Sequence, residues 1–275
     1  MRIRTLIENN PHPDRDDLGA EHGVSFFVEV KDHVYLSDVG QSGSFADNAR
    51  SLGVDLSQVE VLAISHHHYD HGGGLGRFFE ENQHAKVFMR QASTEDFVVD
   101  SPPDPLRYIG LDKGLLKAHS NRIEMIEENQ EVAPGLHLLT DIPDRYPKPD
   151  GDLRLQILRQ DGGLRSDEFK HEIVTVIEGE TGLVLLTGCG HNGVLNMLAA
   201  VHQAFPDRAV QAVIGGFHLH HEGRDEILEV SEKLLAEEIP VVVSGHCTGK
   251  KALSMLEDCL GKRFQRLFTG MTLEF

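Results

Sequence analysis

The sequence predicts a mixed α/β (α+β) fold, because short apolar runs alternate with segments that have helical spacing. The apolar runs occur in both halves of the chain, for example at residues 59–64, 183–187 and 240–244, and each ends in a polar or glycine-containing turn. Residues 192–205 and 222–238 carry apolar side chains at the spacing of helices. Strands and helices that alternate in this way assemble into sheets covered by helices.

In the first half, polar and proline-containing turns separate the predicted elements. Pro11 and Pro13 interrupt the opening strand, and the pair Lys31-Asp32 forms a turn between two strands. The elements predicted here are strands at 2–8, 24–30, 33–38, 59–64 and 86–90 and helices at 44–52 and 75–81.

In the second half, the turn at 179–182 joins two apolar strands into a hairpin, and strands and helices then alternate to the end. The elements predicted here are strands at 172–178, 183–187, 209–214, 240–244, 264–268 and 272–275 and helices at 192–205, 222–238 and 250–259.

The segment at 91–152 is rich in proline and weakly periodic, with strands expected only near 123–126 and 136–140. It is too long for a simple connection in a compact domain. We therefore predict one domain, residues 1–275, with an insertion at about 91–152 that covers or shapes a pocket. A peripheral decoration unrelated to substrate is the alternative.

The composition is that of a globular protein, and it restricts the partners. The net charge of −18 offers no basic stripe, which argues against a nucleic-acid partner but permits a small anionic substrate. Cys189, Cys247 and Cys259 cannot all pair within one chain, which favours a reducing compartment. The first residues do not resemble a signal peptide, and no run is long enough for a bilayer. We therefore expect a cytoplasmic protein without a membrane partner, in an oligomeric state that the sequence leaves open.

The chemistry is concentrated in a loop that follows the apolar run at 59–64. Four imidazoles and one carboxylate fall within six residues, and three glycines follow. His66 and His68 point the same way from an extended strand end and can bind one ion, while Asp70 and His71 face a second position. His67 points to the opposite side and is predicted to be a bystander. A histidine-rich surface loop without a metal is the alternative.

Two later strand ends repeat this arrangement. Cys189 and His191 follow the strand at 183–187, and His246 follows the strand at 240–244. Each places an imidazole directly after a buried strand, where a cleft can use it. His171, which precedes a strand, is the alternative to His191 as the ligand that completes the site.

The motif His66-x-His68-x-Asp70-His71 resembles the HxHxDH signature of the metallo-β-lactamase superfamily. This resemblance implies a four-layer αββα sandwich of two mixed sheets with helices outside and a metal cleft along one edge. It also implies that Asp38, at the end of an upstream strand, orients the loop without binding the metal.

The glycine-rich turns at 188–193, 215–219 and 245–249 look like the dihydropteroate-synthase-like branch of this superfamily, as do residues 21–25 and 38–43. Some members of that branch join a pterin pyrophosphate to an aminobenzene ribofuranosyl phosphate, and others resemble hydrolases. One departure from the superfamily stands out. Many members carry an aspartate that bridges two metals where this chain has Cys189, so we expect one tight metal site and one weak one.

The predicted metal ligands combine these motifs. They are His66, His68, Asp70, His71, Cys189, His191 and His246. Asp70 and His218, which follows a strand within 215–219, are the predicted catalytic residues, with His218 as a ligand, a phosphate donor or a proton shuttle. We expect Zn²⁺ in one or two sites, with Mn²⁺ or Fe²⁺ as the other candidates.

The leading functional hypothesis is a metal-dependent hydrolase that uses a metal-activated water on a small anionic, phosphorylated substrate. The first alternative is a transferase that performs the pterin condensation of the branch. The second alternative is a sensor that binds metal without catalysis.

Overall fold

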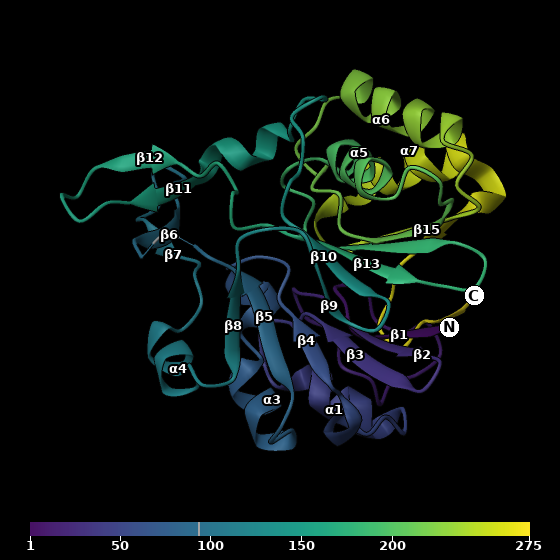
Figure 1. The fold of residues 1–275 in the computed structure, drawn as a ribbon. Coiled ribbons are helices and arrows are strands. Elements are labelled where there is room, and N and C mark those ends of the chain that lie inside the picture. The colour runs from purple at the N-terminus through teal and green to yellow at the C-terminus, as the bar shows by residue number, and fades with distance from the viewer. Residues whose placement is uncertain (93) are drawn as a thin grey trace.

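Two seven-stranded sheets pack face to face in a computed structural model that describes residues 1–92 and 94–275 (Figure 1). The strands of the first sheet are, in spatial order, β18 (Thr272–Glu274), β1 (Arg2–Ile7), β2 (Ser25–Val30), β3 (His33–Ser37), β4 (Val61–Ala63), β5 (Lys86–Arg90) and β8 (Ile123–Ile126). The strands of the second sheet are β17 (Phe264–Arg266), β16 (Val241–Ser244), β15 (Val210–Gly215), β14 (Leu183–Thr187), β13 (Val174–Glu178), β10 (Leu136–Leu139) and β9 (Gln130–Ala133).

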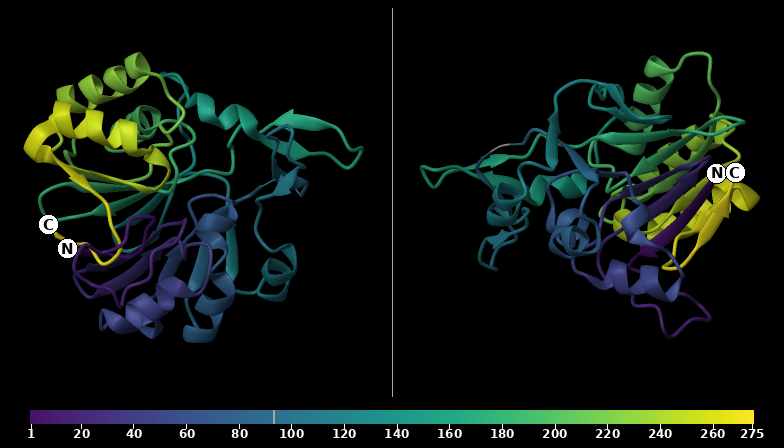
Figure 2. Two further views of the ribbon diagram at one scale, coloured as in Figure 1. Left: turned by 180° about the vertical axis from the view of Figure 1, so that it is seen from behind. Right: turned by 60° about the horizontal axis from the view of Figure 1, so that its bottom comes forward.

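Helices cover the outer face of each sheet and complete four layers, as the two views of Figure 2 show. The helices on the first sheet are α1 (Ser44–Ser51) and α3 (Leu75–Glu81), and those on the second are α5 (Val194–Ala204), α6 (Arg224–Ala236) and α7 (Lys250–Leu260). The short helix α2 (Tyr69–Gly72) lies in the histidine-rich loop, and α4 (Lys113–Ala118) precedes β8. This is the αββα arrangement that the sequence resemblance implies.

The core between the sheets is formed by side chains that alternate along their strands. Phe26 and Tyr35 from the first sheet pack against Ile177, Val184 and Ile214 from the second, and all five are buried. Burial of each such side chain contributes about 1.5–3 kcal/mol to the free energy of folding. This packing fixes the relative position of the two sheets, and therefore of the turns at their edges.

Parallel pairing brings the chemistry-bearing turns together at one edge. The register pairs Thr187 with Gly215 and Gly215 with Ser244, so β14, β15 and β16 all end at one level. In the first sheet β3 and β4 are also parallel and end side by side, at Ser37 and Ala63. Residues that follow these strands therefore meet between the two sheets.

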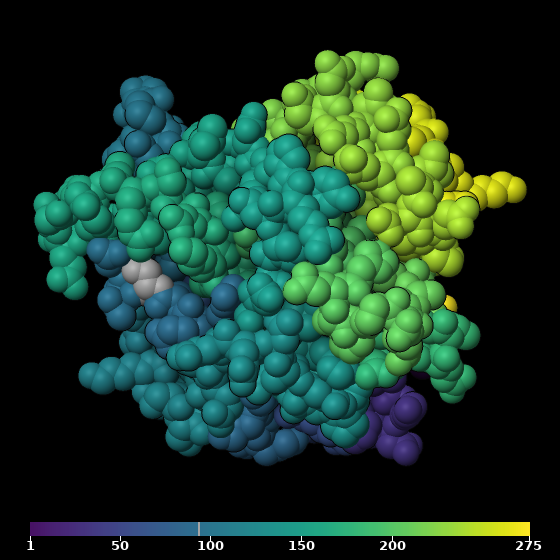
Figure 3. Space-filling model, turned by 45° about the horizontal axis from the view of Figure 1, so that its top comes forward, coloured from purple at the N-terminus to yellow at the C-terminus, as the bar shows by residue number. Residues whose placement is uncertain are grey.

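A third, four-stranded sheet projects from the sandwich, and we call it the arm (Figures 1 and 3). Its strands are, in spatial order, β12 (Leu164–Ser166), β11 (Leu155–Leu158), β6 (Asp96–Val99) and β7 (Arg107–Tyr108). Phe97, Ile109 and Ile157 form its small buried core. The arm is joined to the histidine-rich loop, because His68 forms a β-bridge with Gly110 and the Tyr69 N–H donates to the Ile109 carbonyl at 2.9 Å.

The arm differs from the insertion predicted at 91–152. Within that range β8 extends the first sheet and β9 and β10 extend the second, whereas half of the arm, β11 and β12, lies beyond residue 152. The sequence does not indicate that the arm continues past residue 152, because short strands between prolines give weak periodicity. In addition, pairing between β6 and β11 joins segments about 60 residues apart. Among the described residues, no helix has both the length and the apolarity that a membrane crossing requires.

We predict that Gly215→Ala destabilises the fold much more than Gly53→Ala. Both glycines have positive φ, but a Cβ at Gly215 would lie 2.1 Å from the Thr187 carbonyl oxygen, whereas a Cβ at Gly53 meets nothing within 4 Å. Gly53→Ala should cost roughly 1 kcal/mol for the left-handed backbone alone, and Gly215→Ala at least about 2 kcal/mol, because β14 and β15 must also separate. Urea denaturation midpoints measure both, and equal losses would contradict this explanation.

Candidate metal centre

The first ligand group lies where the histidine-rich loop meets the turn after β14. His66, Cys189 and His191 offer ligand atoms within 4.8 Å of one another, and all three residues are buried. His68 adjoins this group, since its Nδ1 lies 3.1 Å from His66 Nε2. The Nε2 atom of His191 is buried without a hydrogen-bond partner. A buried imidazole nitrogen without a partner, among other nitrogen and sulfur atoms, fits a metal ligand.

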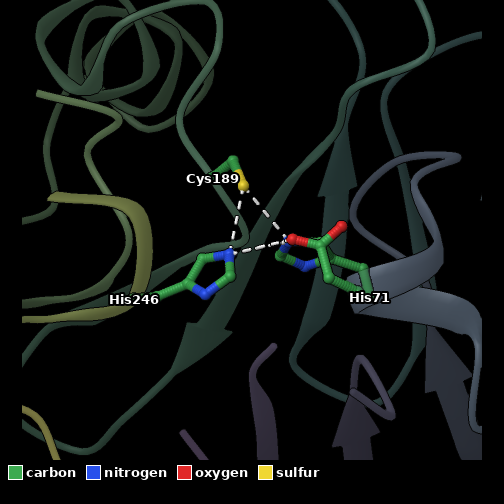
Figure 4. Close-up of side chains that lie close together, drawn as sticks. His71, Cys189 and His246 are labelled. Atoms are coloured by element: carbon green, nitrogen blue, oxygen red, sulfur yellow. Dashed lines mark hydrogen bonds and ion pairs between the residues drawn. The ribbon is translucent and has the colours of Figure 1, made fainter. Parts of the chain in front are cut away.

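The second ligand group contains Asp70, His71, Cys189 and His246. Figure 4 shows His71, Cys189 and His246 pointing toward one another from three different parts of the chain. The Nε2 atom of His71 lies 3.2 Å from Cys189 Sγ and 3.2 Å from His246 Nε2, and Cys189 Sγ lies 3.3 Å from His246 Nε2. The Asp70 carboxylate Oδ2 is 3.3 Å from His246 Nε2 and 3.5 Å from His71 Nε2.

Cys189 belongs to both groups, and this changes the expectation drawn from the sequence. The sequence predicts one tight and one weak site because the bridging aspartate is replaced. The structure places Cys189 in both ligand groups, so its sulfur could serve a metal ion in either of them. Thiolate and imidazole together are a donor set that suits zinc and iron.

Four imidazoles of the two groups have their Nδ1 atom held by an oxygen. The partners of Nδ1 are Ser65 Oγ at 3.0 Å for His66, Asp38 Oδ2 at 2.7 Å for His71, Asp152 Oδ1 at 2.7 Å for His191, and Asn9 Oδ1 at 2.9 Å for His246. An Nδ1–H that donates to oxygen leaves the Nε2 lone pair free for a metal. All four rings are therefore oriented as Nε2 ligands.

Asp38 has the orienting position that the resemblance implies. Its Oδ1 accepts from the Ser65 N–H at 2.7 Å, and its Oδ2 accepts from the Ser65 hydroxyl at 2.7 Å and from His71 Nδ1. Asp38 thus fixes the start of the loop and one ring in it. Asp38 itself belongs to neither of the two ligand groups around Cys189.

Charge and burial act differently on the imidazoles of the two groups. Burial lowers the pKa of His66 and His68 well below the usual value, so both are neutral and able to bind a cation. For His71 burial acts in the same direction, but the carboxylates of Asp70 and Asp38 outweigh it and raise its pKa to about 10. Asp152 likewise raises the pKa of His191 to about 9. The carboxylates that attract these protons would equally favour a divalent cation.

His171, the predicted alternative to His191, and His67, the predicted bystander, belong to neither ligand group around Cys189. The His171 ring is satisfied on both nitrogens, since Nδ1 accepts from the His67 N–H at 3.1 Å and Nε2 lies 2.9 Å from Asp167 Oδ2. This geometry favours His191 over His171 as the completing ligand. His67 Nε2 lies 2.8 Å from the Arg90 carbonyl oxygen, which agrees with a structural role.

Several residues around the centre carry no signal in the sequence. Glu172 accepts from the backbone N–H groups of His191 at 2.9 Å and Asn192 at 2.7 Å, and so fixes that turn. Asp152 comes from the proline-rich segment, far from any motif. Only the contacts made in the fold distinguish these residues from other polar residues.

The centre lies in a cavity of about 980 Å³. Asp70, Cys189, His191 and His246 line one part of it, together with His218. The arm lines another part through Val99, residues 105–109 and residues 154–155. The cavity thus extends from the ligand groups to the arm.

This geometry can be compared with known proteins. Residues 18–246 match the model of the metallo-beta-lactamase superfamily. The chain belongs to that superfamily. It is 28% identical to the 7,8-dihydropterin-6-methyl-4-(beta-D-ribofuranosyl)-aminobenzene-5'-phosphate synthase of Methanocaldococcus jannaschii, over all of this chain and 97% of the relative.

Solved structures agree with this assignment. The superfamily fold here matches Tm1679, a metal-dependent hydrolase of the beta-lactamase superfamily, with a TM-score of 0.84 and 29% identity over 100% of this chain and 99% of the other. Zn²⁺-bound PqqB from Methylobacterium extorquens shares the fold, with a TM-score of 0.56 and 12% identity over all of both chains. The fold class and the resemblance predicted from the sequence are confirmed, and the ligand groups of this superfamily member indicate binding of a divalent metal.

We predict that the protein binds two zinc ions per chain. Cys189→Ala should lose at least one of them and bind any zinc ion that remains at least about tenfold more weakly, because both groups lose their shared ligand. Cys189→Asp, which supplies a carboxylate at the shared position, should retain both ions. Elemental analysis after dialysis gives the stoichiometry.

The control for this experiment is Cys259→Ala. Cys259 is a partly exposed free thiol in α7, outside both ligand groups. Two ions retained by Cys189→Ala would show that its sulfur is not a shared ligand.

Proposed function

We propose that this protein is a metal-dependent hydrolase that uses a metal-activated water on a small anionic, phosphorylated substrate. The observation that carries the proposal is the pair of ligand groups that share the Cys189 sulfur and line one large cavity. Divalent ions held there would supply a water of lowered pKa as nucleophile and offset negative charge that develops on the substrate. Zn²⁺ fits the donor set best, with Mn²⁺ and Fe²⁺ as alternatives.

The residues around the cavity have distinct roles in this proposal. Asp70 was predicted as a catalytic residue or a ligand, and its contacts with His71, His246 and His22 support the ligand role. His218 lines the cavity, with its ring centroid 4.4 Å from that of His191. We assign to His218 the transfer of a proton to the leaving group, because it lines the cavity beside His191 and belongs to neither ligand group around Cys189.

The arm supplies the features that would select an anionic substrate. Arg107, Val99 and Leu155 are register neighbours on three adjacent strands, and all three line the cavity. Arg107 and Arg154 are the two Lys or Arg residues among the described residues that line it. Apolar residues and two guanidinium groups that line one cavity suit a substrate with an apolar body and a phosphate.

A transferase is the second candidate, because the synthase of Methanocaldococcus jannaschii is similar over the full length of this chain. In that reaction a pyrophosphate group would be the leaving group, and the arginines of the arm would bind the phosphate of the acceptor. The same cavity would serve both reactions, so the chemistry must be tested directly.

The decisive experiment compares the two reactions with one zinc-loaded preparation. One assay contains bis(4-nitrophenyl) phosphate, and the other contains a pterin pyrophosphate with an aminobenzene ribofuranosyl phosphate. Turnover of the diester alone supports the hydrolase and excludes the transferase, and condensation alone does the reverse. No turnover of either, with both metals bound, would support the sensor hypothesis.

We predict that removal of the metals with a chelator abolishes turnover and that His68→Ala lowers kcat at least about a hundredfold, because His68 is a predicted ligand and its ring lies against His66 of the first group. His67→Gln is the matched control in the same loop, since an amide can still donate to the Arg90 carbonyl. Steady-state kinetics after metal loading measures both variants. Unchanged kcat in His68→Ala would contradict the proposed centre.

We predict that Arg107→Ala and Arg154→Ala each raise KM for a phosphorylated substrate about tenfold, because a hydrogen bond between charged groups is lost. Their kcat should stay within about threefold of the wild-type value, since neither residue adjoins a ligand group. Arg159→Ala, at an exposed turn of the arm outside the cavity, is the control. An unchanged KM in both cavity variants would show that the phosphate of the substrate does not bind at these two arginines.

A further inference from the structure

The connection between the arm and the metal centre is a short 3₁₀ turn, Asp150–Arg154. It leads directly into β11, which is an inner strand of the arm. The Asp150 N–H donates to Glu222 Oε1 at 2.5 Å, so this turn is anchored on the second half of the sandwich. The position of this turn therefore contributes to the position of the arm, together with the contacts of Gly110 and Ile109 with the histidine-rich loop.

Asp152 extends from this turn toward the first ligand group. Its Oδ1 accepts from His191 Nδ1 at 2.7 Å and lies 3.0 Å from His218 Nδ1, and the residue is only 8% exposed. The other three imidazoles with an anchored Nδ1 are held by Ser65, Asp38 and Asn9. These three anchors follow β1, β3 and β4 at one edge of the first sheet. His191 is the one imidazole of the four whose anchor is next to the arm.

The Asp152 contacts are incomplete in the structure as it stands. Its Oδ2 is buried without a hydrogen-bond partner, as is His191 Nε2. A buried polar atom without a partner is unfavourable. Asp152, His191 and His218 also form one of the clusters that could hold a metal ion, which fits an arrangement built around a cation at His191.

We propose that Asp152 is a positioning residue that couples docking of the arm to metal binding at His191. When the arm is docked, Asp152 holds the His191 ring with Nε2 toward Cys189. A metal ion bound at Nε2 would make the Nδ1–H a stronger donor, and would so strengthen the hold on Asp152 and on β11. A loaded centre would thus stabilise the docked arm that forms part of the cavity wall. This inference rests on the metal centre of the proposed function but on neither of its candidate reactions.

The test uses Zn²⁺ alone, without substrate, so its failure is separable from failure of the proposed reaction. Hydrogen–deuterium exchange of the full chain is measured with and without Zn²⁺, and Zn²⁺ affinity is measured by competition with a chromophoric chelator. In the wild-type protein Zn²⁺ should slow exchange in β6 and β11 of the arm. Equal exchange in these strands with and without Zn²⁺ would overturn the coupling and requires no variant.

Asp152→Asn should weaken Zn²⁺ affinity 10- to 100-fold and abolish the protection of the arm by Zn²⁺. Asp150→Asn is the matched control, because Asp150 is exposed, lies in the same turn and contributes its backbone rather than its side chain to the Glu222 contact. Asp152→Glu, which keeps a carboxylate, should recover part of the affinity and part of the protection. Wild-type affinity and arm protection in Asp152→Asn would refute the proposal.

Discussion

The site depends on parallel strands that end at one edge between two packed sheets. β14, β15 and β16 are in register, so the turns that carry Cys189, His218 and His246 leave the second sheet at one level. The histidine-rich loop leaves the first sheet opposite them. The inter-sheet core holds these edges at a constant separation, and the dense packing of a protein interior makes that separation stiff. Ligands far apart in sequence thus meet without long or flexible loops.

This convergence has a cost that the fold must offset. Asp38, His218 and His246 have left-handed backbone conformations, with φ of 58°, 51° and 48°. Each costs roughly 1–2 kcal/mol for a residue with a Cβ. The buried imidazoles and the Cys189 thiol also lose hydration, and burial raises the pKa of that thiol well above its usual value. A bound cation would offset these costs, which would couple metal binding to stability.

The sequence predicted the parts of the site that depend on local pattern. A strand end followed by alternating histidines predicts one pair of ligands, and glycine turns after apolar runs indicated His191 and His246. The arm and Asp152 could not be found in this way, because their strands are short and pair over long separations. The role of Cys189 also needed the structure, since only geometry shows that one sulfur lies between two groups.

The division between the sandwich and the arm separates two kinds of chemistry. The sandwich supplies the ligand groups, which depend on the register of strands and tolerate little change. The arm supplies Arg107, Val99 and Leu155, which line the cavity from a small sheet with its own core. Under the proposed function, substitutions on the arm's cavity face would alter substrate binding and leave the ligand groups unchanged. The arm nevertheless meets the metal centre at two places. Asp152, at the root of the arm, contacts His191, and Gly110 and Ile109 pair with His68 and Tyr69 of the histidine-rich loop.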